Sequence, residues 1–198
     1  MRDRAQVFID GVPVGVVERW DPKPLRIDIP AEGAELTVLV ENMGRINYGP
    51  LLRDRKGITE GVRLDNQFLY GWTVYCLPLE SPEGLLFQPM PDDPVSSPEG
   101  PAFYAGTFHV DEAADTFIRL DGWTKGLVFV NGFHLGRYWE RGPQKTLYLP
   151  GPLLKPGENR LVVFELHGAG EPVVLLTDTP DLGEPAGVDP DVLSFTEQ

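Results

Sequence analysis

The stretch LVFVNGFHLGRYW, residues 127–139, decides the fold of this 198-residue chain. An apolar run comes first, Asn131-Gly132 follows, and a second run carries two large aromatic residues and a cation. Asn followed by Gly readily supplies the positive φ that a type I′ turn needs at both central residues. The stretch therefore predicts a β-hairpin with Asn131-Gly132 at its turn.

The same pattern occurs a second time near the start of the chain. VFIDGVPVG (7–15) shares with VFVNGFHLG (128–136) an apolar-Phe-apolar run, an Asx-Gly pair and a second Gly four residues later, at an offset of 121. Downstream, GAELTVLVE (33–41) matches GENRLVVFE (157–165) at an offset of 124. Two related units at nearly constant spacing indicate duplicated domains, because solenoid repeats are much shorter. The duplication predicts another hairpin, with its turn at Asp10-Gly11.

Short apolar runs punctuated by 22 Gly and 20 Pro predict an all-β protein built of antiparallel jelly-roll sandwiches. Pro-rich residues 83–102 are predicted to form a long surface loop, because Pro and Gly there would interrupt any strand pairing. The strands are expected near 5–9, 14–18, 25–29, 36–41, 58–64, 73–79, 105–110, 115–121, 126–131, 135–139, 145–149, 160–166 and 172–176.

The two copies differ in what precedes them. Residues 67–127, with several predicted strands, come before the second hairpin, whereas only six residues come before Val7. A hairpin without the rest of its sandwich would expose strand edges and an apolar face. We therefore expect the chain to begin inside a domain. The expected domains are 1–65, the C-terminal half of a first jelly roll; 66–177, a second and complete jelly roll; and 178–198, an acidic irregular tail.

Composition argues against several classes of function. Seventeen basic against 30 acidic residues give a formal charge of -13, which repels nucleic acid and anionic membranes. The single Cys76 excludes an internal disulfide, and three His without metal-ligand spacing predict no metal site. No apolar run approaches the ~20 residues of a membrane span, and no signal peptide follows Met1. We expect a soluble chain with neither a nucleic-acid nor a membrane partner, and the sequence leaves open whether its compartment is cytoplasmic or secreted.

Aromatic residues are the candidates for binding. Arg137 and Trp139 fall on one face of the returning strand and Tyr138 on the other, because side chains alternate along a strand. An Arg beside a ring can bind a sugar, whose C–H face favours rings and whose hydroxyls favour a guanidinium. The alternative is packing, with Arg137 bound by backbone carbonyls beneath Trp139 at a domain contact. The same two interpretations, sugar platform or core packing, apply to three further aromatic residues: Trp72, Tyr104 and Trp123.

The residues alone indicate no catalytic site. Four carboxylates lie in or beside predicted strands, and no pattern selects two of them as acid and nucleophile. Nucleophile-elbow, P-loop and dinucleotide motifs are missing from the sequence. Cys76 lies in an apolar run and is predicted to be a buried thiol. The four carboxylates are Glu41, Asp115, Asp121 and Glu165.

One long stretch, DTFIRLDGWTKGLVFVNGFHLGRYWERGPQKTLYLPGPLLKPGENRLVVFEL (115–166), closely resembles the C-terminal part of family 35 glycoside hydrolases, the β-galactosidases. The resemblance continues through PAFYAGTF (101–108), VENMGRINYGPLLRDRKGITEGVRLD (40–65) and DRAQVFIDGVPVG (3–15). It covers nearly everything except the Pro-rich loop and the tail.

This resemblance implies an architecture. The family combines a catalytic (β/α)8 barrel, which holds two catalytic Glu residues, with two galactose-binding-like jelly rolls. By resemblance, this chain is the second half of the first jelly roll and all of the second. Its partner is the barrel, in the same parent chain or a separate one, and a galactoside is reached through that barrel. No catalytic residue transfers to this chain, and no cofactor or metal is expected.

The resemblance also implies roles for individual residues. The loop that holds Asn47 and Tyr48 is expected to approach the barrel mouth, where the Tyr48 ring would line the rim of the sugar pocket. Residues 136–139 and 142–144 are expected to be framework.

Three hypotheses follow. The first is a non-catalytic C-terminal region of a β-galactosidase-like glycoside hydrolase, which braces the barrel and shapes the rim of its pocket. The second is a free-standing galactose- or carbohydrate-binding module. The third is one chain of a split β-galactosidase.

Overall fold

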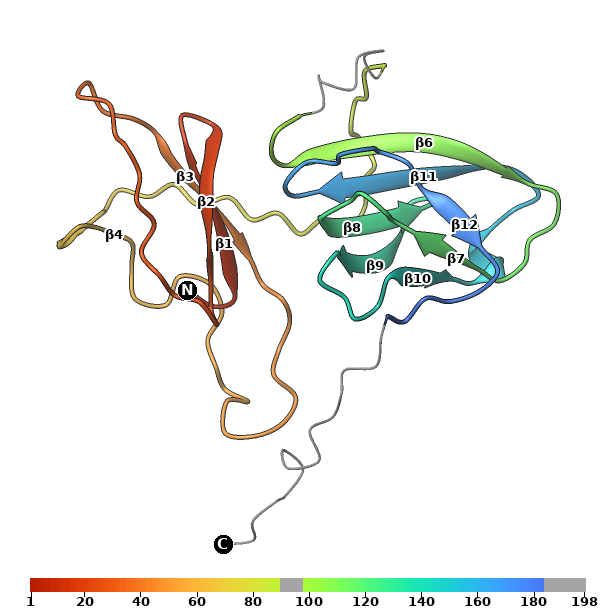
Figure 1. Ribbon diagram of the computed structural model, residues 1–198, viewed down its shortest axis with the longest axis horizontal. Helices are drawn as coiled ribbons and strands as arrows, with labels where there is room; N and C mark the ends of the chain where they lie inside the picture. Colours follow the sequence, from red (N-terminus) through yellow and green to blue (C-terminus); the bar gives the residue numbers. More distant parts are fainter. Residues whose placement is uncertain (90–97, 184–198) are drawn as a thin grey trace, which may run out of the picture. The chain divides into compact units, whose positions relative to one another are not determined.

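The computed structural model describes residues 1–89 and 98–183 and is all-β, as the sequence predicts. The chain divides into two compact units, Met1–Leu77 and a second that begins at Pro78. This division lies twelve residues beyond the boundary expected at 65/66. Figure 1 shows the strands β1 (Arg4–Ile9), β2 (Val12–Glu18), β3 (Leu36–Glu41), β4 (Arg63–Leu64), β5 (Gln67–Phe68), β6 (Ala102–Val110), β7 (Thr116–Arg119), β8 (Lys125–Val130), β9 (Phe133–Trp139), β10 (Thr146–Leu149), β11 (Gly157–Glu165) and β12 (Leu175–Thr177), and η2 is a 3₁₀ turn (Gly151–Leu153).

The first unit is built on one antiparallel sheet in the order β2-β1-β3. β1 is the central strand, with Val7 opposite Gly15 on one side and Val38 on the other. The short strands β4 and β5 form a separate hairpin. Ala5 and Phe8 are the buried apolar side chains of this sheet.

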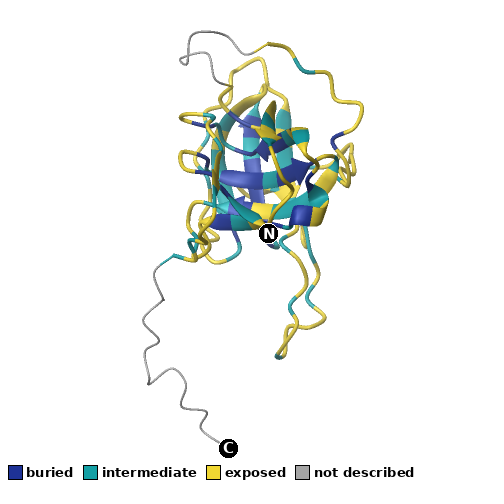
Figure 2. Ribbon diagram, turned by 90° about the vertical axis from the view of Figure 1, so that its right-hand side faces the viewer, coloured by how far each residue is buried: buried dark blue, intermediate teal, exposed yellow. Residues whose placement is uncertain are grey.

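The second unit is a sandwich of two antiparallel sheets, in the orders β6-β11-β8-β9 and β10-β7-β12 (Figure 1). Its core lies between the sheets, where Figure 2 shows the buried residues concentrated. β8 and β11 contribute Val128, Val130 and Val163, and the opposing sheet contributes Ile118 and Leu149. Full burial of such a side chain stabilises the fold by roughly 1.5–3 kcal/mol, so these few residues hold the layers together.

Both Asx-Gly pairs form the predicted turns. Asn131 and Gly132 have φ of 49° and 83°, and Asp10 and Gly11 have φ of 48° and 79°. Positive φ at both central residues is what a type I′ turn requires. The β1–β2 register shifts between Val7 and Phe8, and the β8–β9 register shifts between Val128 and Phe129, so each hairpin carries its irregularity at the same place.

The side chain of Asn131 ties its turn to neighbouring segments. Its amide nitrogen donates to Leu153 O at 2.9 Å and to Asn159 Oδ1 at 2.8 Å. Its side-chain oxygen accepts the Arg160 N–H at 2.9 Å. Asn159 is fully buried, and its amide nitrogen donates to Lys155 O at 2.8 Å.

Four predicted strands are wrong in whole or part. Residues 25–29 and 73–79 form no strand in the described chain, of 58–64 only Arg63–Leu64 does, and of 172–176 only the last two residues do. These segments do contain the apolar residues typical of strands. A strand also needs a neighbouring strand with which it exchanges backbone hydrogen bonds along its length. The buried thiol predicted at Cys76 is wrong for the same reason, because that side chain is exposed in an unpaired segment.

The two irregular segments are only partly described. Residues 83–89 and 98–101 contain no strand, and residues 90–97 of the predicted Pro-rich loop lie outside the described residues. Within the expected tail, 178–183 contain no strand, and Asp181 N–H donates to Thr146 Oγ1 at 2.9 Å. Residues 184–198 lie outside the described part of the chain.

Candidate functional site

The loop that follows β3 carries the two residues expected at a pocket rim. We call residues 43–56 the Tyr48 loop. Asn47 and Tyr48 lie side by side on it and are exposed, Tyr48 to 81%. A turn closed by the Asp54 N–H, which donates to Leu51 O at 2.9 Å, shapes the second half of the loop. The Tyr48 ring can therefore be reached by a ligand.

A buried carboxylate lies at the base of the Tyr48 loop. The two oxygens of Asp3 accept hydrogen bonds from Lys56 Nζ at 2.7 and 2.8 Å, and Oδ2 also accepts the Met43 N–H at 3.0 Å. Arg19 Nη1 lies 3.6 Å from Oδ1. Burial opposes ionisation, but the hydrogen bonds from Lys56 and Met43 and the two cations outweigh it and hold the pKa of Asp3 below its ordinary 3.8. Asp3 is therefore an anion at neutral pH.

A second ionic cluster lies on the same sheet. Arg4 Nε donates to Glu18 Oε1 at 3.1 Å, and its Nη1 lies 3.5 Å from Glu41 Oε2. The side chains of Arg4 and Glu18 are only 5% and 10% exposed. Buried charges are costly unless they are paired, so this cluster serves structure. The predicted strand carboxylate Glu41 is engaged in it.

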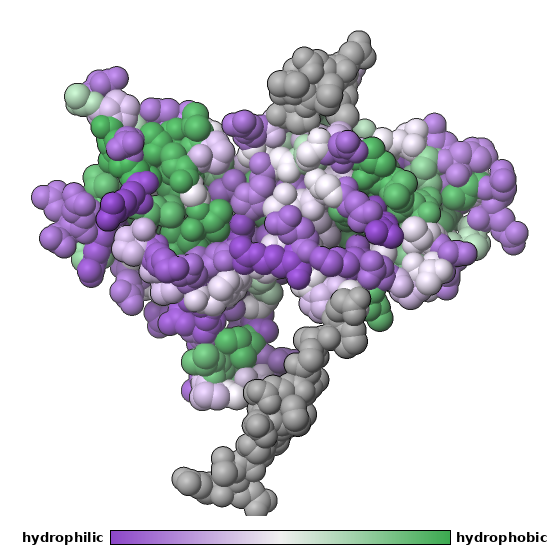
Figure 3. Space-filling view, in the orientation of Figure 1, coloured by the Kyte–Doolittle hydropathy of each residue, from purple (hydrophilic) through white to green (hydrophobic). Residues whose placement is uncertain are grey.

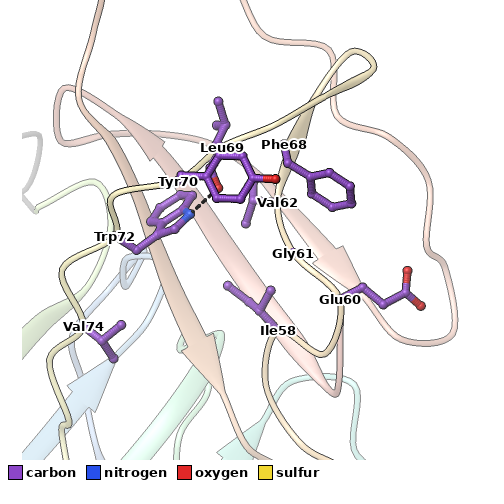
Figure 4. Close-up of a pocket in the computed structure, with 9 residues that line it drawn as sticks. All are labelled: Ile58, Glu60, Gly61, Val62, Phe68, Leu69, Tyr70, Trp72 and Val74. Atoms are coloured by element: carbon purple, nitrogen blue, oxygen red, sulfur yellow. Dashed lines mark hydrogen bonds between the residues drawn. The ribbon is translucent and has the colours of Figure 1, made fainter.

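An apolar cleft of about 490 Å³ lies within the first unit (Figure 4). Tyr70 and Trp72 are 85% and 40% exposed, and the Trp72 indole N–H donates to Leu69 O at 3.0 Å. Phe68 lies 6.4 Å from Tyr70 between ring centroids. In Figure 4 the carboxylate of Glu60 points away from Tyr70 and Trp72. The cleft thus offers ring faces, and its other lining is mostly aliphatic: Ile58, Gly61, Val62 and Val74.

Hydrophobic side chains also gather on the surface of the first unit (Figure 3). Val74, Tyr75 and Leu77 are 80%, 81% and 60% exposed. Exposed apolar groups in such number are typical of an interaction surface rather than of a solvated one.

The remaining residues of the predicted sugar platform lie in the second unit, whereas Trp72 lies in the first. Trp123 is 3% exposed, donates its indole N–H to Val173 O at 2.8 Å, and contacts Tyr104 edge-on with centroids 5.0 Å apart. A ring buried this deeply offers no face to a sugar. Tyr104 is half-buried against it and packs on the core.

Trp139 and Arg137 follow the predicted alternation with Tyr138. Tyr138 is buried, Trp139 is half-buried and Arg137 is exposed. Two cations flank the Trp139 ring, Lys125 Nζ at 4.4 Å and the Arg141 guanidinium at 4.9 Å from the centroid. These contacts occupy a ring face that a sugar would need.

Glu165 is the centre of a buried polar cluster. It accepts the Tyr138 hydroxyl at 2.8 Å and the backbone N–H groups of Thr124 at 2.9 Å and His167 at 2.8 Å. Burial raises the pKa of Tyr138, and the charge of Glu165 adds to that effect, so the hydroxyl stays a donor. A carboxylate bound by this many donors orders the framework around β9 and β11.

The other predicted carboxylates are also engaged. Asp115 accepts the Gly151 N–H at 2.8 Å and the Tyr148 hydroxyl at 2.7 Å, and these bonds hold its pKa below the ordinary value. Asp121 accepts Arg119 Nε at 2.7 Å. Both carboxylates are thus hydrogen-bonded to groups of the framework.

Residues 1–89 and 98–183 offer neither a metal-ligand cluster nor a membrane-spanning helix. No group of three or more His, Cys, Asp or Glu there could hold a metal ion. In the same residues, none of the helical segments is long and apolar enough to cross a membrane.

Sequence reasoning missed Asp3 and Lys56, which meet although 53 positions separate them. It also missed Phe68 and Tyr70 beside the predicted Trp72. The aromatic spacing of residues 68, 70 and 72 is a signal that could have found the cleft, because alternate residues share a face of extended chain. No local pattern could have found the Asp3–Lys56 pair.

Two family models match the chain. The model described as the β-galactosidase first all-beta domain matches residues 1–79, and the one described as the β-galactosidase galactose-binding domain matches residues 101–159.

Curated relatives match over most of this chain. Beta-galactosidase 8 of Oryza sativa subsp. japonica is 39% identical over 91% of the chain, and beta-galactosidase-1-like protein 2 of Homo sapiens is 43% identical over 92%. Beta-galactosidase 17 of Arabidopsis thaliana is 42% identical over 84%. The chain spans only 33%, 29% and 28% of these relatives' lengths, so the relatives are larger proteins of which this region is one part.

Proposed function

Because this chain belongs to the β-galactosidases of glycoside hydrolase family 35 and corresponds to their C-terminal region, we propose that it is a non-catalytic β-sandwich region of such an enzyme. Its work is to brace the catalytic barrel and to shape the rim of the barrel's sugar pocket. The whole enzyme would hydrolyse terminal β-galactosides.

The observation that carries the proposal is the pair of matched domains, in order and over most of the chain. Both are β domains, whereas a (β/α)8 barrel is built from eight strands that alternate with eight helices. The described residues contain strands and one 3₁₀ turn, so they supply no such barrel. The engaged carboxylates Glu41, Asp115, Asp121 and Glu165 agree with a supporting role.

The partner that this proposal assigns is the barrel, in the same longer parent chain. The exposed apolar side chains of the first unit, such as Val74 and Leu77, support a surface that is covered in the complete protein. Asn47 and Tyr48 are the rim residues. The Tyr48 ring would contact the C–H face of a galactoside held in the barrel, and the Tyr48 hydroxyl would contact a hydroxyl of that sugar.

The first test measures hydrolysis of a nitrophenyl β-galactoside. The purified 198-residue chain should give no turnover, and a polypeptide that joins it to the barrel should give turnover. Activity of the chain alone that co-purifies with it through several separations would contradict the proposal. Activity restored by mixing with a separate barrel chain would identify a split enzyme.

The second test addresses Tyr48 in the joined polypeptide. Tyr48→Ala should lower kcat/KM roughly 10-fold or more, because lost positioning at a pocket rim is expensive in rate. Phe133→Ala is the control, since Phe133 is also an exposed aromatic residue (52%) but lies on β9 of the second unit, outside this apolar surface. Equal effects of the two substitutions would remove the rim assignment.

The cleft at Trp72 favours one other candidate function, a carbohydrate-binding module. Its ring faces are the chemistry that a sugar uses, although Glu60 points away from them (Figure 4). Calorimetric titration with galactose or galactan should then give saturable heat that Trp72→Ala abolishes. Silence at millimolar sugar would exclude this candidate.

A further inference from the structure

One carboxylate binds both ends of the Tyr48 loop. Met43, the first residue of the loop, donates its N–H to Asp3 Oδ2, and Lys56, the last, donates Nζ to both oxygens. The carboxylate therefore closes a loop of which Tyr48 is a central residue. Holding the two ends of a loop together costs conformational entropy. The hydrogen bonds of Asp3 to both ends offset part of that cost.

Further contacts join the same base to the start of the chain. The Arg2 N–H donates to Gly57 O at 2.9 Å, and Gly57 N–H donates back to Arg2 O. Arg19 Nη1 reaches Asp54 Oδ2 at 2.5 Å, and the Arg19 N–H donates to Asp3 O at 2.8 Å. Asp3 is thus held by its own backbone as well as by its partners, which makes it a fixed point.

The middle of the Tyr48 loop is much more exposed than its base. Asp3 is 5% exposed, whereas Tyr48 is 81% exposed and Leu51 and Leu52 are about half exposed. A ring with so little packing of its own takes its position from the ends of the segment that carries it.

We propose that Asp3 is a positioning residue that clamps both ends of the Tyr48 loop and so fixes the ring of Tyr48. The consequence for catalysis rests on the proposed function, whereas the clamp itself does not. Loss of the Asp3 charge should leave the sheet β2-β1-β3 folded and release the loop.

Limited trypsin digestion of the 198-residue chain tests the clamp. The loop holds tryptic cleavage sites after Arg45, Arg53, Arg55 and Lys56, and the first two serve as the reporting loop sites because Lys56→Met leaves them intact. The site after Arg26 lies elsewhere in the same unit. Asp3→Asn should speed cleavage at the two loop sites roughly 10-fold, because proteolysis tracks the population of the opened segment. Lys56→Met should do the same.

The matched control is Asp21→Asn. Asp21 is also paired with a cation, Lys23 at 3.0 Å, but it is exposed. It should leave all three cleavage rates unchanged. Unchanged loop cleavage in Asp3→Asn would overturn the clamp, and so would an equal rise at all three sites, because Asp3 would then hold the whole unit.

A double-mutant cycle in the joined polypeptide tests the positioning role. Asp3→Asn should lower kcat/KM when Tyr48 is present and change it little in a Tyr48→Ala background. Equal losses in both backgrounds would overturn positioning through Tyr48. If Tyr48→Ala alone has no effect while loop cleavage still rises in Asp3→Asn, the rim assignment fails and the clamp stands.

Discussion

The two hairpins of this chain, β1–β2 and β8–β9, have the same local structure in different surroundings. Each has an Asx-Gly turn, a register shift after the fourth residue of its first strand, and a third strand on the far side of that strand. In both, the turn residue exchanges bonds with the third strand or the residue before it: Asp10 with Glu35, and Asn131 with Arg160.

What surrounds the hairpins separates them. The β8–β9 sheet has a fourth strand, β6, and a second sheet facing it, so Val128 and Val130 are fully buried. The β1–β2 sheet has three strands, and its equivalents Val7 and Ile9 are half-buried. The difference teaches that a short sequence determines a hairpin, whereas its partners determine its core. Four predictions test this comparison, from the largest expected effect to the smallest.

The largest effect is expected at Gly126, whose equivalent in the first hairpin is Ala5. A Cβ at Gly126 would lie 1.7 Å from Phe164 O, a backbone atom that cannot turn aside. Gly126→Ala should destabilise the second unit by about 3 kcal/mol or more, at the upper end for overpacking. Urea unfolding followed at Trp123 and Trp139 measures it. Gly106→Ala is the control, because nothing lies within 4 Å of its Cβ, and equal losses would contradict the steric reason.

The next effect compares the cations at equivalent positions, Arg4 and Lys125. Arg4→Met leaves the carboxylates of Glu18 and Glu41 without this cation and should cost about 3 kcal/mol. Lys125→Met loses a contact with the Trp139 ring and should cost about 1 kcal/mol. Hydrogen exchange in peptides covering 4–18 and 125–139 reports each hairpin separately. A larger loss at Lys125 would reverse the comparison.

The third effect compares the carboxylates that end β3 and β11. Glu165→Gln places an NH2 group among donors and should cost about 2 kcal/mol, because a buried donor is left without an acceptor. Glu41→Gln should cost less, since the Glu41 side chain is 18% exposed. Urea unfolding of both variants measures the loss in free energy of unfolding. Equal losses would show that the difference in burial between Glu165 and Glu41 has no effect on stability.

The smallest effect is the pH dependence that Asp3 gives to the stability of the first unit. The pKa of Asp3 is lower in the folded state than its unfolded value, so its contribution is present above about pH 4 and is lost as pH falls through the folded pKa. Asp3→Asn should therefore be less stable than the parent by about 1 kcal/mol at pH 7. The gap should narrow below about pH 4. A gap that widens on acidification would contradict the lowered pKa.

Local chemistry explains which parts of the fold the sequence could predict. Both turns and most strands of the second unit follow from Asx-Gly pairs and alternation, and the structure confirms them. Residues 25–29 alternate equally well and 73–79 form an apolar run, but strand formation there depends on a neighbouring strand that no local pattern reveals. For the same reason Cys76 could not be placed.

The candidate site was less predictable. Tyr48 and Asn47 came from family resemblance, and their exposure agrees with the role proposed for them. The clamp of Asp3 on Met43 and Lys56 joins residues 40 and 53 positions apart, so only the folded chain brings it together. The stacking on Trp139 was expected from Arg137, whereas Lys125 and Arg141 provide the observed contacts, because pairing across strands places Lys125 opposite Trp139.

The bonds of Asn131 bear on how the protein ages. An Asn-Gly pair deamidates when the following backbone nitrogen attacks the side-chain carbonyl carbon, and this requires the side chain to swing round. Here that carbonyl accepts the Arg160 N–H, and the amide nitrogen donates to Leu153 O and Asn159 Oδ1. The swing must break all three bonds, so storage damage at this turn should proceed only as fast as the hairpin opens.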